Sequence, residues 1–510
     1  MPRYAAIDIG SNSIRMQAAE VVAGDAPRSL AADREVTRLG ESVFGRGAIS
    51  EEAMDATVGV LRRMAAQYRK LDVLGARVVA TSAVRDARNQ REFLERASEA
   101  VGTEVEAISG REEARLIHLG VQSRWPHPTG RLLIVDIGGG SIEVICAENG
   151  RMRDAVSKPL GAVRLQEAFL KTDPPTPQGL HQLDEYIEEK LSGLARRLGG
   201  NSWRRVVATS ATAAAVVAVT SQVSRAKREQ VDRLRASTRQ VRQLYRKLSV
   251  RNLAERRKVS GIGPRRAEII IPGVAVLLRV LEHFHAPSVW HSAAGVRDGI
   301  IADLAARGVG RELTQLSREQ RREVEKMARR YGSSMPHVRH VARLAHGLFC
   351  CLQPLHQLPP NHGRLLEAAA YLHDIGHFVN DASHHKHSYY LVSNSDMLGF
   401  TSREREFIAN LCRYHRKAMP SPAHGNYQGL GGADRQALVL LAPLLRLADS
   451  LDRGHVQRVG GVECRIRDDG VTMALAPDGD VELEYWAAER AAELFTQVYD
   501  RPMTLMKVRA

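Results

Sequence analysis

The chain has 510 residues, of which 44% are hydrophobic and 26% are charged, so a disordered or fibrous protein is excluded. This length exceeds what one hydrophobic core usually serves, and we expect several domains. Lys and Arg number 73 against 58 Asp and Glu, a net charge of +15 that favours a polyanionic partner such as nucleic acid, an anionic membrane surface or a phosphate-rich substrate.

The cysteines and the apolar segments bear on where the protein works. Five cysteines form no Cys-x-x-Cys pair, which is typical of a reducing compartment rather than of a disulfide framework. The chain opens on a strand-like run, so we expect no signal peptide, and the longest apolar stretch, 211–219, has about half of the ~20 residues that span a bilayer. We therefore expect a cytoplasmic protein.

Two short patterns recur in the first part of the chain at one constant offset. Asp-Ile-Gly follows an apolar run at 8–10 and again at 136–138, and small polar residues come next in both copies. Val-Val-Ala-Thr-Ser-Ala occurs at 78–83 and at 206–211, so both pairs lie 128 residues apart. This duplication predicts two copies of one α/β unit that face each other across a cleft. The predicted copies are residues 1–125 and 126–309.

Each Asp-Ile-Gly segment combines features that suit a phosphate. A strand that runs directly into small residues exposes backbone N–H groups, which form an anion-binding nest. The carboxylates of Asp8 and Asp136 cannot bind phosphate themselves, so a divalent cation is their natural partner. A single copy is equally well explained as a glycine-rich turn, but two copies at one offset predict a phosphate site.

Charged side chains near these segments are candidates for the same cleft. Arg85 follows the first Val-Val-Ala-Thr-Ser run and Arg15 follows the first turn, and a guanidinium is well shaped for phosphate. Ser109 and Glu112 form a capping-box pattern, which gives Glu112 a structural task at a helix start. Glu113 is then free to deprotonate a water molecule beside the phosphate, and a solvated surface residue is the alternative interpretation.

Together these segments closely resemble the exopolyphosphatase and guanosine pentaphosphate phosphohydrolase family, which belongs to the actin-like ATPase superfamily. The matching stretches are 6–13, 80–85, 109–117, 136–143, 265–273 and 292–299. The resemblance implies two duplicated actin-like, RNase H-like α/β domains. It also implies an enzyme that releases terminal phosphate from linear inorganic polyphosphate by water attack.

The resemblance assigns roles to individual residues. Glu113 would be the general base, and Mg²⁺ or Mn²⁺ would be the cofactor. This cation would be held by Asp8, Asp136 and Glu143. The phosphate-binding residues would be Gly10, Ser11, Asn12, Ser13, Arg85, Gly138, Gly139 and Ser141. From the same resemblance we expect a homodimer.

Several other activities stay open on the sequence. Guanosine pentaphosphate presents the same terminal phosphoanhydride, so its hydrolysis in the same cleft is the first alternative. Phosphoryl transfer would need a nucleotide pocket, and Ala211 stands where the family usually has glycine, which disfavours such a pocket. A cleft that binds polyphosphate without cutting it is the non-enzymatic alternative. The fourth is a nucleotide-directed activity in the histidine-rich region described below.

The segment 225–258 carries thirteen basic residues against three acids, and its apolar residues keep a partly helical spacing. This pattern predicts one or two amphipathic helices with a cationic face. A chain of phosphates explains the charge, and RNA or peripheral contact with an anionic membrane is the alternative. Tyr245 is the lone aromatic residue of the segment, so we expect no specific nucleic-acid partner.

Histidines concentrate in the third part of the chain, where twelve of the nineteen lie between 337 and 424. Imidazole and carboxylate groups at helix ends suit a divalent metal such as Mn²⁺, Fe²⁺ or Zn²⁺. The order His, His-Asp, His, His, Asp resembles the HD phosphohydrolase superfamily, which implies an all-α domain over 310–455. The implied ligands are His337, His373, Asp374, His384, His415 and Asp449, with His340, His385 and His387 as alternatives. An inherited but catalytically idle site is the other interpretation.

The last segment, 456–510, contains short alternating runs and ends in a helical pattern. We expect a small α+β domain there and assign it no chemistry.

Overall fold

The computed structural model describes residues 1–22, 27–127, 129–199, 202–224, 227, 231–307 and 314–507. The chain forms two compact units, Met1–Gly310 and Arg311–Ala510. Arg225, Arg228 and Glu229 of the basic segment lie outside the described residues, as does the predicted boundary at 309–310. Among the described residues, no helix combines the length and the apolar character needed to cross a membrane.

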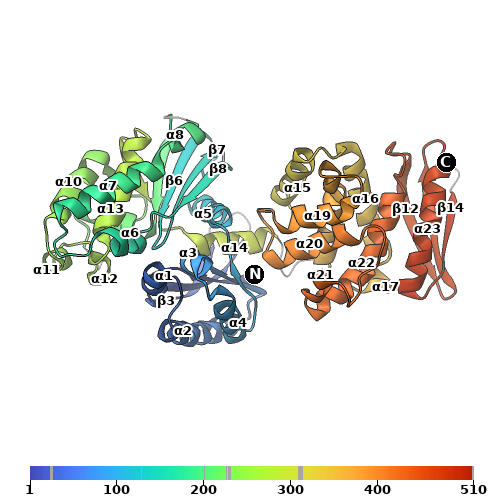
Figure 1. Ribbon diagram of the computed structural model, residues 1–510, viewed down its shortest axis with the longest axis horizontal. Coiled ribbons are helices and arrows are strands. Elements are labelled where there is room, and N and C mark those ends of the chain that lie inside the picture. Colours follow the sequence, from blue (N-terminus) through green and yellow to red (C-terminus); the bar gives the residue numbers. More distant parts are fainter. Residues whose placement is uncertain are drawn as a thin grey trace. The chain divides into compact units, whose positions relative to one another are not determined.

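The first unit contains two mixed sheets built on the same plan (Figure 1). The first has the order β3-β2-β1-β4-β5, with bounds Arg28–Glu35, Ile14–Glu20, Arg3–Ile9, Gly75–Ala80 and Val105–Ala107. The second has the order β10-β11-β9-β6-β7-β8, with bounds Arg235–Ser237, Ser288–His291, Arg205–Thr209, Arg131–Ile137, Ile142–Glu148 and Arg151–Lys158. β1 pairs with β2 antiparallel and with β4 parallel, and β6 pairs with β7 and β9 in the same way. The predicted duplication is therefore confirmed.

The central strands β1 and β6 explain where the acids lie. Both are near-continuous apolar runs because both of their faces are covered, as in other strands buried inside α/β sheets. Asp8 and Asp136 are the last residue but one of these strands. Ligands of α/β sheets bind at this carboxyl end, so the fold brings both acids to the expected edge.

Two helices, α5 (Gly110–Arg124) and α14 (Val296–Ala306), share a buried core with one face of each sheet. They cross closely, because a Cβ atom on Gly299 would lie 1.8 Å from the carbonyl oxygen of Leu116. Only glycine permits such an approach. The helix that carries Glu113 is therefore fixed against both sheets.

The other helices of the first unit pack on the opposite faces of the sheets. Those on the first sheet are α1 (Leu39–Arg46), α2 (Glu51–Arg69), α3 (Ser82–Asp86) and α4 (Gln90–Val101). Those on the second are α6 (Ala162–Phe169), α7 (Pro177–Leu191), α8 (Leu194–Arg197), α9 (Ser210–Thr220), α10 (Thr238–Ser249), α11 (Leu253–Arg257), α12 (Pro264–Ala267) and α13 (Ile270–His283).

The described part of the basic segment is helical, as predicted. In α10, Val241, Leu244 and Leu248 are buried against the second sheet's core while the basic side chains stay outside. Part of the charge is neutralised within the fold. Arg242 pairs with Glu282 at 2.8 Å, Arg256 with Asp173 at 2.9 Å and Arg257 with Glu268 at 3.0 Å. Less of the positive charge is thus available to a partner than the count of residues indicates.

The second unit is mainly helical and ends in a small sheet. Its helices are α15 (Arg318–Arg330), α16 (Met335–Cys351), α17 (Gln353–His356), α18 (Asn361–Leu372), η2 (Ile375–Phe378), α19 (His384–Ser393), α20 (Ser402–Tyr414), α21 (Gly425–Gln428), α22 (Gly432–Ser450) and α23 (Glu482–Tyr499). The sheet has the order β12-β13-β14, with bounds Val459–Arg467, Gly470–Pro477 and Met503–Lys507. The strands and the closing helix predicted after residue 456 are therefore present.

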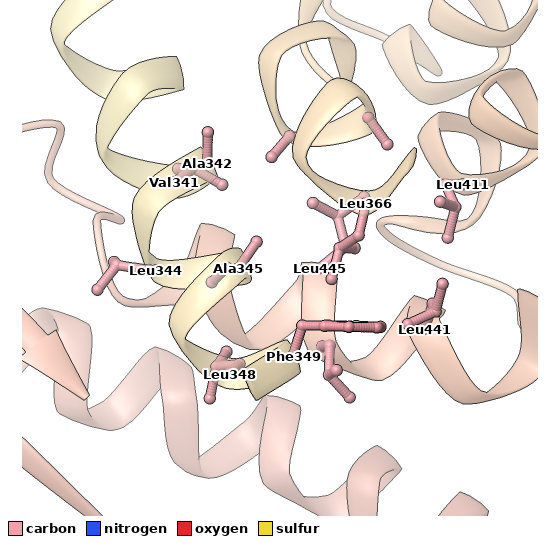
Figure 2. Close-up of a cluster of buried hydrophobic side chains, with 14 of the residues drawn as sticks. Val341, Ala342, Leu344, Ala345, Leu348, Phe349, Leu366, Leu411, Leu441 and Leu445 are labelled. Carbon is pink, nitrogen blue, oxygen red and sulfur yellow. The ribbon is translucent and has the colours of Figure 1, made fainter. Parts of the chain in front are cut away.

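One buried cluster joins these elements. Figure 2 shows side chains of α16 directed toward Leu366 of α18 and Leu445 of α22. The same cluster includes Val471 and Met473 of β13, so the C-terminal strands and the helices share one core. This core supports the helix ends at which the histidines lie.

Candidate active site

A cavity of about 690 Å³ lies between the carboxyl edges of the two sheets in the first unit. Its lining brings together Asp8, Gly10, Ser11, Asn12, Ser13, Glu113, Asp136, Gly138, Gly139 and Ser141. Arg85 and Glu143, the other two residues predicted for the cleft, do not line the cavity. They interact with residues that do, Arg85 with Glu113 and Glu143 with Asp136.

The two glycine-containing turns have the same local structure. The Gly10 N–H donates to the Ser13 carbonyl at 3.2 Å, and the Gly138 N–H donates to the Ser141 carbonyl at 3.0 Å. The turns also approach each other, because a Cβ atom on Gly139 would lie 3.0 Å from Cβ of Ser11. Two glycine-containing turns of the same local structure therefore face one cavity.

The acids at the strand ends, Asp8 and Asp136, are half-buried, and their carboxyls are close enough to interact electrostatically. Burial raises the pKa of Asp8 to about 6, with a smaller contribution from Asp136, while Arg15 and Arg297 act in the opposite direction. Burial also raises the pKa of Asp136, against a hydrogen bond that the Thr209 hydroxyl donates to it. Both carboxyls are thus held in an environment that disfavours their negative charge.

Glu113 stands at the first turn of α5, whose N-terminus is capped by Ser109. Burial raises the pKa of Glu113 well above its usual value, the charge of Glu143 raises it further, and Arg85 opposes both. Nη1 of Arg85 lies 3.5 Å from Oε2 of Glu113 and donates at 2.7 Å to the Ile108 carbonyl. A buried carboxylate with a raised pKa is suited to accept a proton.

Glu143 is fully buried behind Asp136. The Ser157 hydroxyl donates to its Oε1 at 2.8 Å, and its Oε2 has no hydrogen-bond partner among the described residues. Burial, followed by the charge of Asp136, raises the pKa of Glu143 to about 8. A carboxylate oxygen with no partner in a buried site is ready to accept a cation or a hydrogen bond from a ligand.

These observations fit a divalent cation. Glu113 and Glu143 are buried and Asp8 and Asp136 are half-buried, and neighbouring carboxyls in such a site must be protonated or neutralised by a cation. Mg²⁺ in particular is usually held by one or two carboxylates together with substrate phosphates and water. Asp8, Asp136 and Glu143 offer oxygens of this kind beside the two glycine-containing turns.

Sequence reasoning missed Ser210, which lines the cavity. Its backbone has a φ of +81°, in the left-handed region, and its hydroxyl is buried with no partner among the described residues. Strained residues of this kind concentrate at functional sites. The sequence carried no signal for Ser210, because Ser82 occupies the equivalent place in an identical hexapeptide. In the structure the two serines differ, since the Ser82 hydroxyl forms a hydrogen bond of 3.0 Å with the Ser11 hydroxyl.

In the second unit, five of the six predicted metal ligands line a separate cavity of about 770 Å³: His337, Asp374, His384, His415 and Asp449. The sixth, His373, is fully buried and contacts Asp374 and Asp449. Oδ1 of Asp374 lies 3.6 Å from Nε2 of His373, 3.4 Å from Nε2 of His384 and 3.7 Å from Nε2 of His415. Donor atoms of His337, His373, Asp374 and Asp449 lie within 4.8 Å of one another. His340, His385 and His387 are absent from the donor clusters found among the described residues.

The imidazole rings are oriented for metal binding. Nδ1 of His373 donates to the Ala370 carbonyl at 2.9 Å, and Nδ1 of His415 donates to the Cys412 carbonyl at 2.7 Å. In a neutral ring the Nε2 atom then carries a lone pair toward Asp374. The charge of Asp374 and the hydrogen bond to Asp449 outweigh burial and raise the pKa of His373 to about 9, so a metal would displace a proton from that ring. Backbone acceptors fix metal-binding histidines in the same way in known metal sites. Burial lowers the pKa of His415 to about 3, which keeps that ring neutral and able to bind a metal.

Two further residues of this site were not predicted. His377 forms a second donor cluster with Asp374 and His384. Oδ2 of Asp452 lies 2.9 Å from Nδ1 of His337. Both follow a predicted ligand by three residues, Asp374 and Asp449 respectively, so helical spacing was the signal that could have found them.

Known proteins resemble this chain over most of its length. The model of the Ppx/GppA phosphatase family matches residues 18–307, and the model of Ppx/GppA phosphatase domain III matches residues 320–483. A protein of Photobacterium profundum named guanosine-5'-triphosphate,3'-diphosphate pyrophosphatase is 27% identical over 423 residues, which is 82% of each chain. Because the match in the second unit is to domain III, the HD-type assignment stays a prediction.

Solved structures agree with the fold of the first unit. The Ppx/GppA family member of Aquifex aeolicus is 30% identical with a TM-score of 0.53, over 60% of this chain and 97% of that one. An exopolyphosphatase from Cytophaga hutchinsonii is 25% identical with a TM-score of 0.55, over 59% and 97% of the two chains. With one family model covering more than half of its length, the chain belongs to the Ppx/GppA phosphatase family, whose members are phosphoanhydride hydrolases that generally depend on a divalent metal.

Proposed function

We propose that the protein is an exopolyphosphatase, which releases orthophosphate from the end of linear inorganic polyphosphate. The observation that carries this proposal is the position of Glu113, a buried carboxyl with a raised pKa in a cavity that two phosphate-binding turns also line. A base, two anion nests and a set of acids for a cation are the parts that hydrolysis of a phosphoanhydride needs.

The terminal phosphate lies between the two turns. Backbone N–H groups and the hydroxyls of Ser11, Ser13 and Ser141 donate to its oxygens, and Arg85 supplies positive charge from the side. Glu113 accepts a proton from a water molecule, whose oxygen attacks the terminal phosphorus. The bond to the bridging oxygen breaks, orthophosphate leaves, and the shortened chain keeps the bridging oxygen as its new end.

Asp8, Asp136 and Glu143 would hold Mg²⁺ or Mn²⁺ in this cleft. The cation supplies charge neutralisation on the phosphate oxygens, which lowers the cost of the negative charge that develops during attack. Burial raises the pKa of all three carboxyls, so their charged forms are disfavoured without the cation.

The lining favours inorganic polyphosphate over a nucleotide. Among the described residues of the cavity there is no Phe, Tyr or Trp on which a guanine could stack. A neighbouring cavity of about 340 Å³ is lined by Arg34, Arg265 and Arg266, which suits further phosphates. Hydrolysis of guanosine pentaphosphate in the same cleft is the alternative, favoured by the name of the Photobacterium relative.

Phosphate release from the two substrates separates these proposals. With equal concentrations of phosphate ends, we expect a higher kcat/KM for polyphosphate than for guanosine pentaphosphate. A higher value for the nucleotide would make the alternative the main activity. A Glu113→Gln chain, which keeps the size of the side chain, serves as the control for contaminating phosphatases in both assays.

We also propose that the second unit binds a divalent metal such as Mn²⁺, Fe²⁺ or Zn²⁺. Rings held by backbone carbonyls with Nε2 facing Asp374 support this proposal. Titration of the metal-free chain with Mn²⁺ should show a site that Asp374→Ala removes and Glu113→Gln keeps. Equal Mn²⁺ binding by the Asp374→Ala chain and the unaltered chain would contradict it.

A further inference from the structure

A cluster of arginine and tryptophan side chains lies on the first unit, outside the cavity described above. The guanidinium of Arg205 contacts two indoles, with its Cζ atom 4.4 Å from the ring centre of Trp125 and 5.0 Å from that of Trp290. Arg233 lies over Trp125 at 5.4 Å and Arg235 over Trp290 at 5.9 Å. We call these five residues the Arg–Trp cluster.

The cluster is a product of the fold rather than of one segment. Trp125 follows α5, Arg205 begins β9, Arg235 begins β10 and Trp290 belongs to β11. The two indoles meet edge to face with ring centres 6.0 Å apart. Packing of guanidinium groups against fixed aromatic rings orients them before any ligand binds, which lowers the entropy lost on binding.

The positive charge of the cluster is poorly neutralised. Among the described residues, the one ion pair that its arginines make is between Arg233 and Asp232, at 3.9 Å. Asp232 is also engaged by the Ala293 N–H, which donates to it at 2.7 Å. His127, 3.0 Å from Arg205, has its pKa lowered by burial and by the charges of the surrounding arginines. The cluster therefore keeps a local excess of positive charge.

The cluster adjoins the cavity wall. The Arg233 N–H donates at 2.8 Å to the carbonyl of His291, which lines the cavity. Trp290 precedes His291 in β11, and Val231, two residues before Arg233, also lines the cavity. A chain whose end lies at Glu113 and that leaves the cavity on this side meets Arg233 and then Arg235.

We propose that the Arg–Trp cluster is a second binding site for inorganic polyphosphate, which holds phosphates of the chain that lie outside the cavity. This inference rests on the proposed exopolyphosphatase function. An unbranched phosphate chain presents regularly spaced anionic oxygens, and guanidinium groups bind such oxygens through paired N–H donors.

RNA is a poorer match to the same surface. Recognition of single strands depends on aromatic rings that are free to stack on bases. Here each indole is half-buried and already contacts two guanidinium groups. Phosphate oxygens, by contrast, need only the exposed N–H groups of Arg233 and Arg235.

The test measures affinity separately from hydrolysis. A Glu113→Gln chain is titrated with long-chain polyphosphate and with tripolyphosphate as the short chain. We expect Arg233→Ala with Arg235→Ala to lower the affinity for the long chain about tenfold, and to reduce the ratio of long-chain to short-chain affinity by a similar factor. The variant with Arg233→Lys and Arg235→Lys keeps both charges. Its affinity for the long chain should lie between that of the parent chain and that of the double alanine variant.

Arg62→Ala with Arg151→Ala is the matched control, because both arginines are exposed and lie outside the cluster. It should bind long chains as the parent does. Unchanged long-chain affinity in the Arg233/Arg235 variant would overturn the proposal, and so would an equal loss for both chain lengths. Tighter binding of a single-stranded RNA of equal charge would overturn the choice of occupant. If the unaltered protein released no phosphate from polyphosphate while the length effect persisted, the proposed function would fail and the binding site would stand.

Discussion

Glu112 and Glu113 are neighbours in the first turn of α5, yet their carboxyls lie in opposite electrostatic environments. Burial alone would raise the pKa of Glu112, but Arg115 and Arg77 outweigh it and hold the pKa below its usual value. The pKa of Glu113 is raised well above its usual value by burial and by nearby Glu143. One turn of helix thus carries both a carboxylate held in its charged form and a carboxyl with a raised pKa, which we propose to be the proton acceptor.

Replacement of Glu113 tests the second of these roles. We expect Glu113→Gln to lower kcat for polyphosphate about 100- to 10,000-fold, because a general base contributes a factor of that size. KM should change little, since the turns and Arg85 remain. Steady-state phosphate release measures both constants. A kcat within threefold of that of the unaltered protein would remove Glu113 from the mechanism.

Replacement of Arg115 tests the first role. Arg115 is fully buried, and its guanidinium binds Glu112 at 2.8 Å and Asp303 at 2.8 Å. Arg115→Ala removes a guanidinium group that neutralises the buried carboxylates of Glu112 and Asp303, which costs about 3–5 kcal/mol of stability. We expect a clear fall in the melting temperature of the first unit, measured by differential scanning calorimetry.

The matched control is Arg91→Ala, which removes an exposed arginine that pairs with Glu95. Exposed pairs of this type contribute little, so the melting temperature should not move measurably. A similar melting temperature for the two variants would show that the buried ion pairs do not stabilise the domain.

Replacement of Ser210 by glycine should change stability and activity in opposite directions. The left-handed backbone of Ser210, with a φ of +81°, stores strain that glycine would relieve, so Ser210→Gly should stabilise the protein by about 1 kcal/mol. Turnover should fall, because the hydroxyl leaves the cavity. Ser82→Gly at the equivalent position of the first copy relieves no such strain and loses a hydrogen bond to Ser11. If both variants lowered the melting temperature equally, strain at Ser210 would be excluded.

The contribution of Glu143 to stability should depend on pH in a direction that its raised pKa defines. A carboxyl whose pKa rises on folding holds its proton more tightly in the folded state. Its contribution to stability is therefore fully present below 4.5 and is lost as the pH rises through about 8. With divalent cations removed, the melting temperature of the unaltered chain minus that of Glu143→Gln should decrease between pH 4.5 and 8.

Thermal melts across this pH range provide the measurement. The Gln variant carries no titrating group at the position, so acids and histidines away from the cleft affect both chains alike. Glu113 and Asp136 interact with Glu143, so their titration contributes to the measured difference as well. A difference that increases with pH would mean that Glu143 is ionised in the folded protein.

The sequence predicted the parts of the site that local pattern specifies. Asp8 and Asp136 were identified because an apolar strand followed by glycine and small polar residues is visible in a short window. The proposed metal ligands of the second unit were identified because histidines and carboxylates are rare enough for their order to be informative. The duplicated sheets followed from one repeated offset.

What the sequence did not predict depends on tertiary contacts. The Ser109–Glu112 pattern correctly marked the helix start, where the Ser109 hydroxyl accepts from the Glu112 N–H. The Glu112 carboxylate, however, binds Arg77 of β4, whose guanidinium also binds Asp303 of α14, and these contacts depend on tertiary structure. No aromatic platform was expected near the basic segment, because Trp125 and Trp290 reach it only through the fold. The positive φ of Ser210 could not be predicted either, because the identical hexapeptide of the first copy does not hold Ser82 in the left-handed region.

The most direct test of the account compares three chains in one assay of phosphate release from polyphosphate: the unaltered protein, Glu113→Gln and Asp374→Ala. We predict that Glu113→Gln abolishes nearly all release, because the hydrolytic site lies in the cleft of the first unit. Normal release by the Glu113→Gln chain together with loss in the Asp374→Ala chain would contradict the account and place the hydrolysis at the histidine cluster of the second unit.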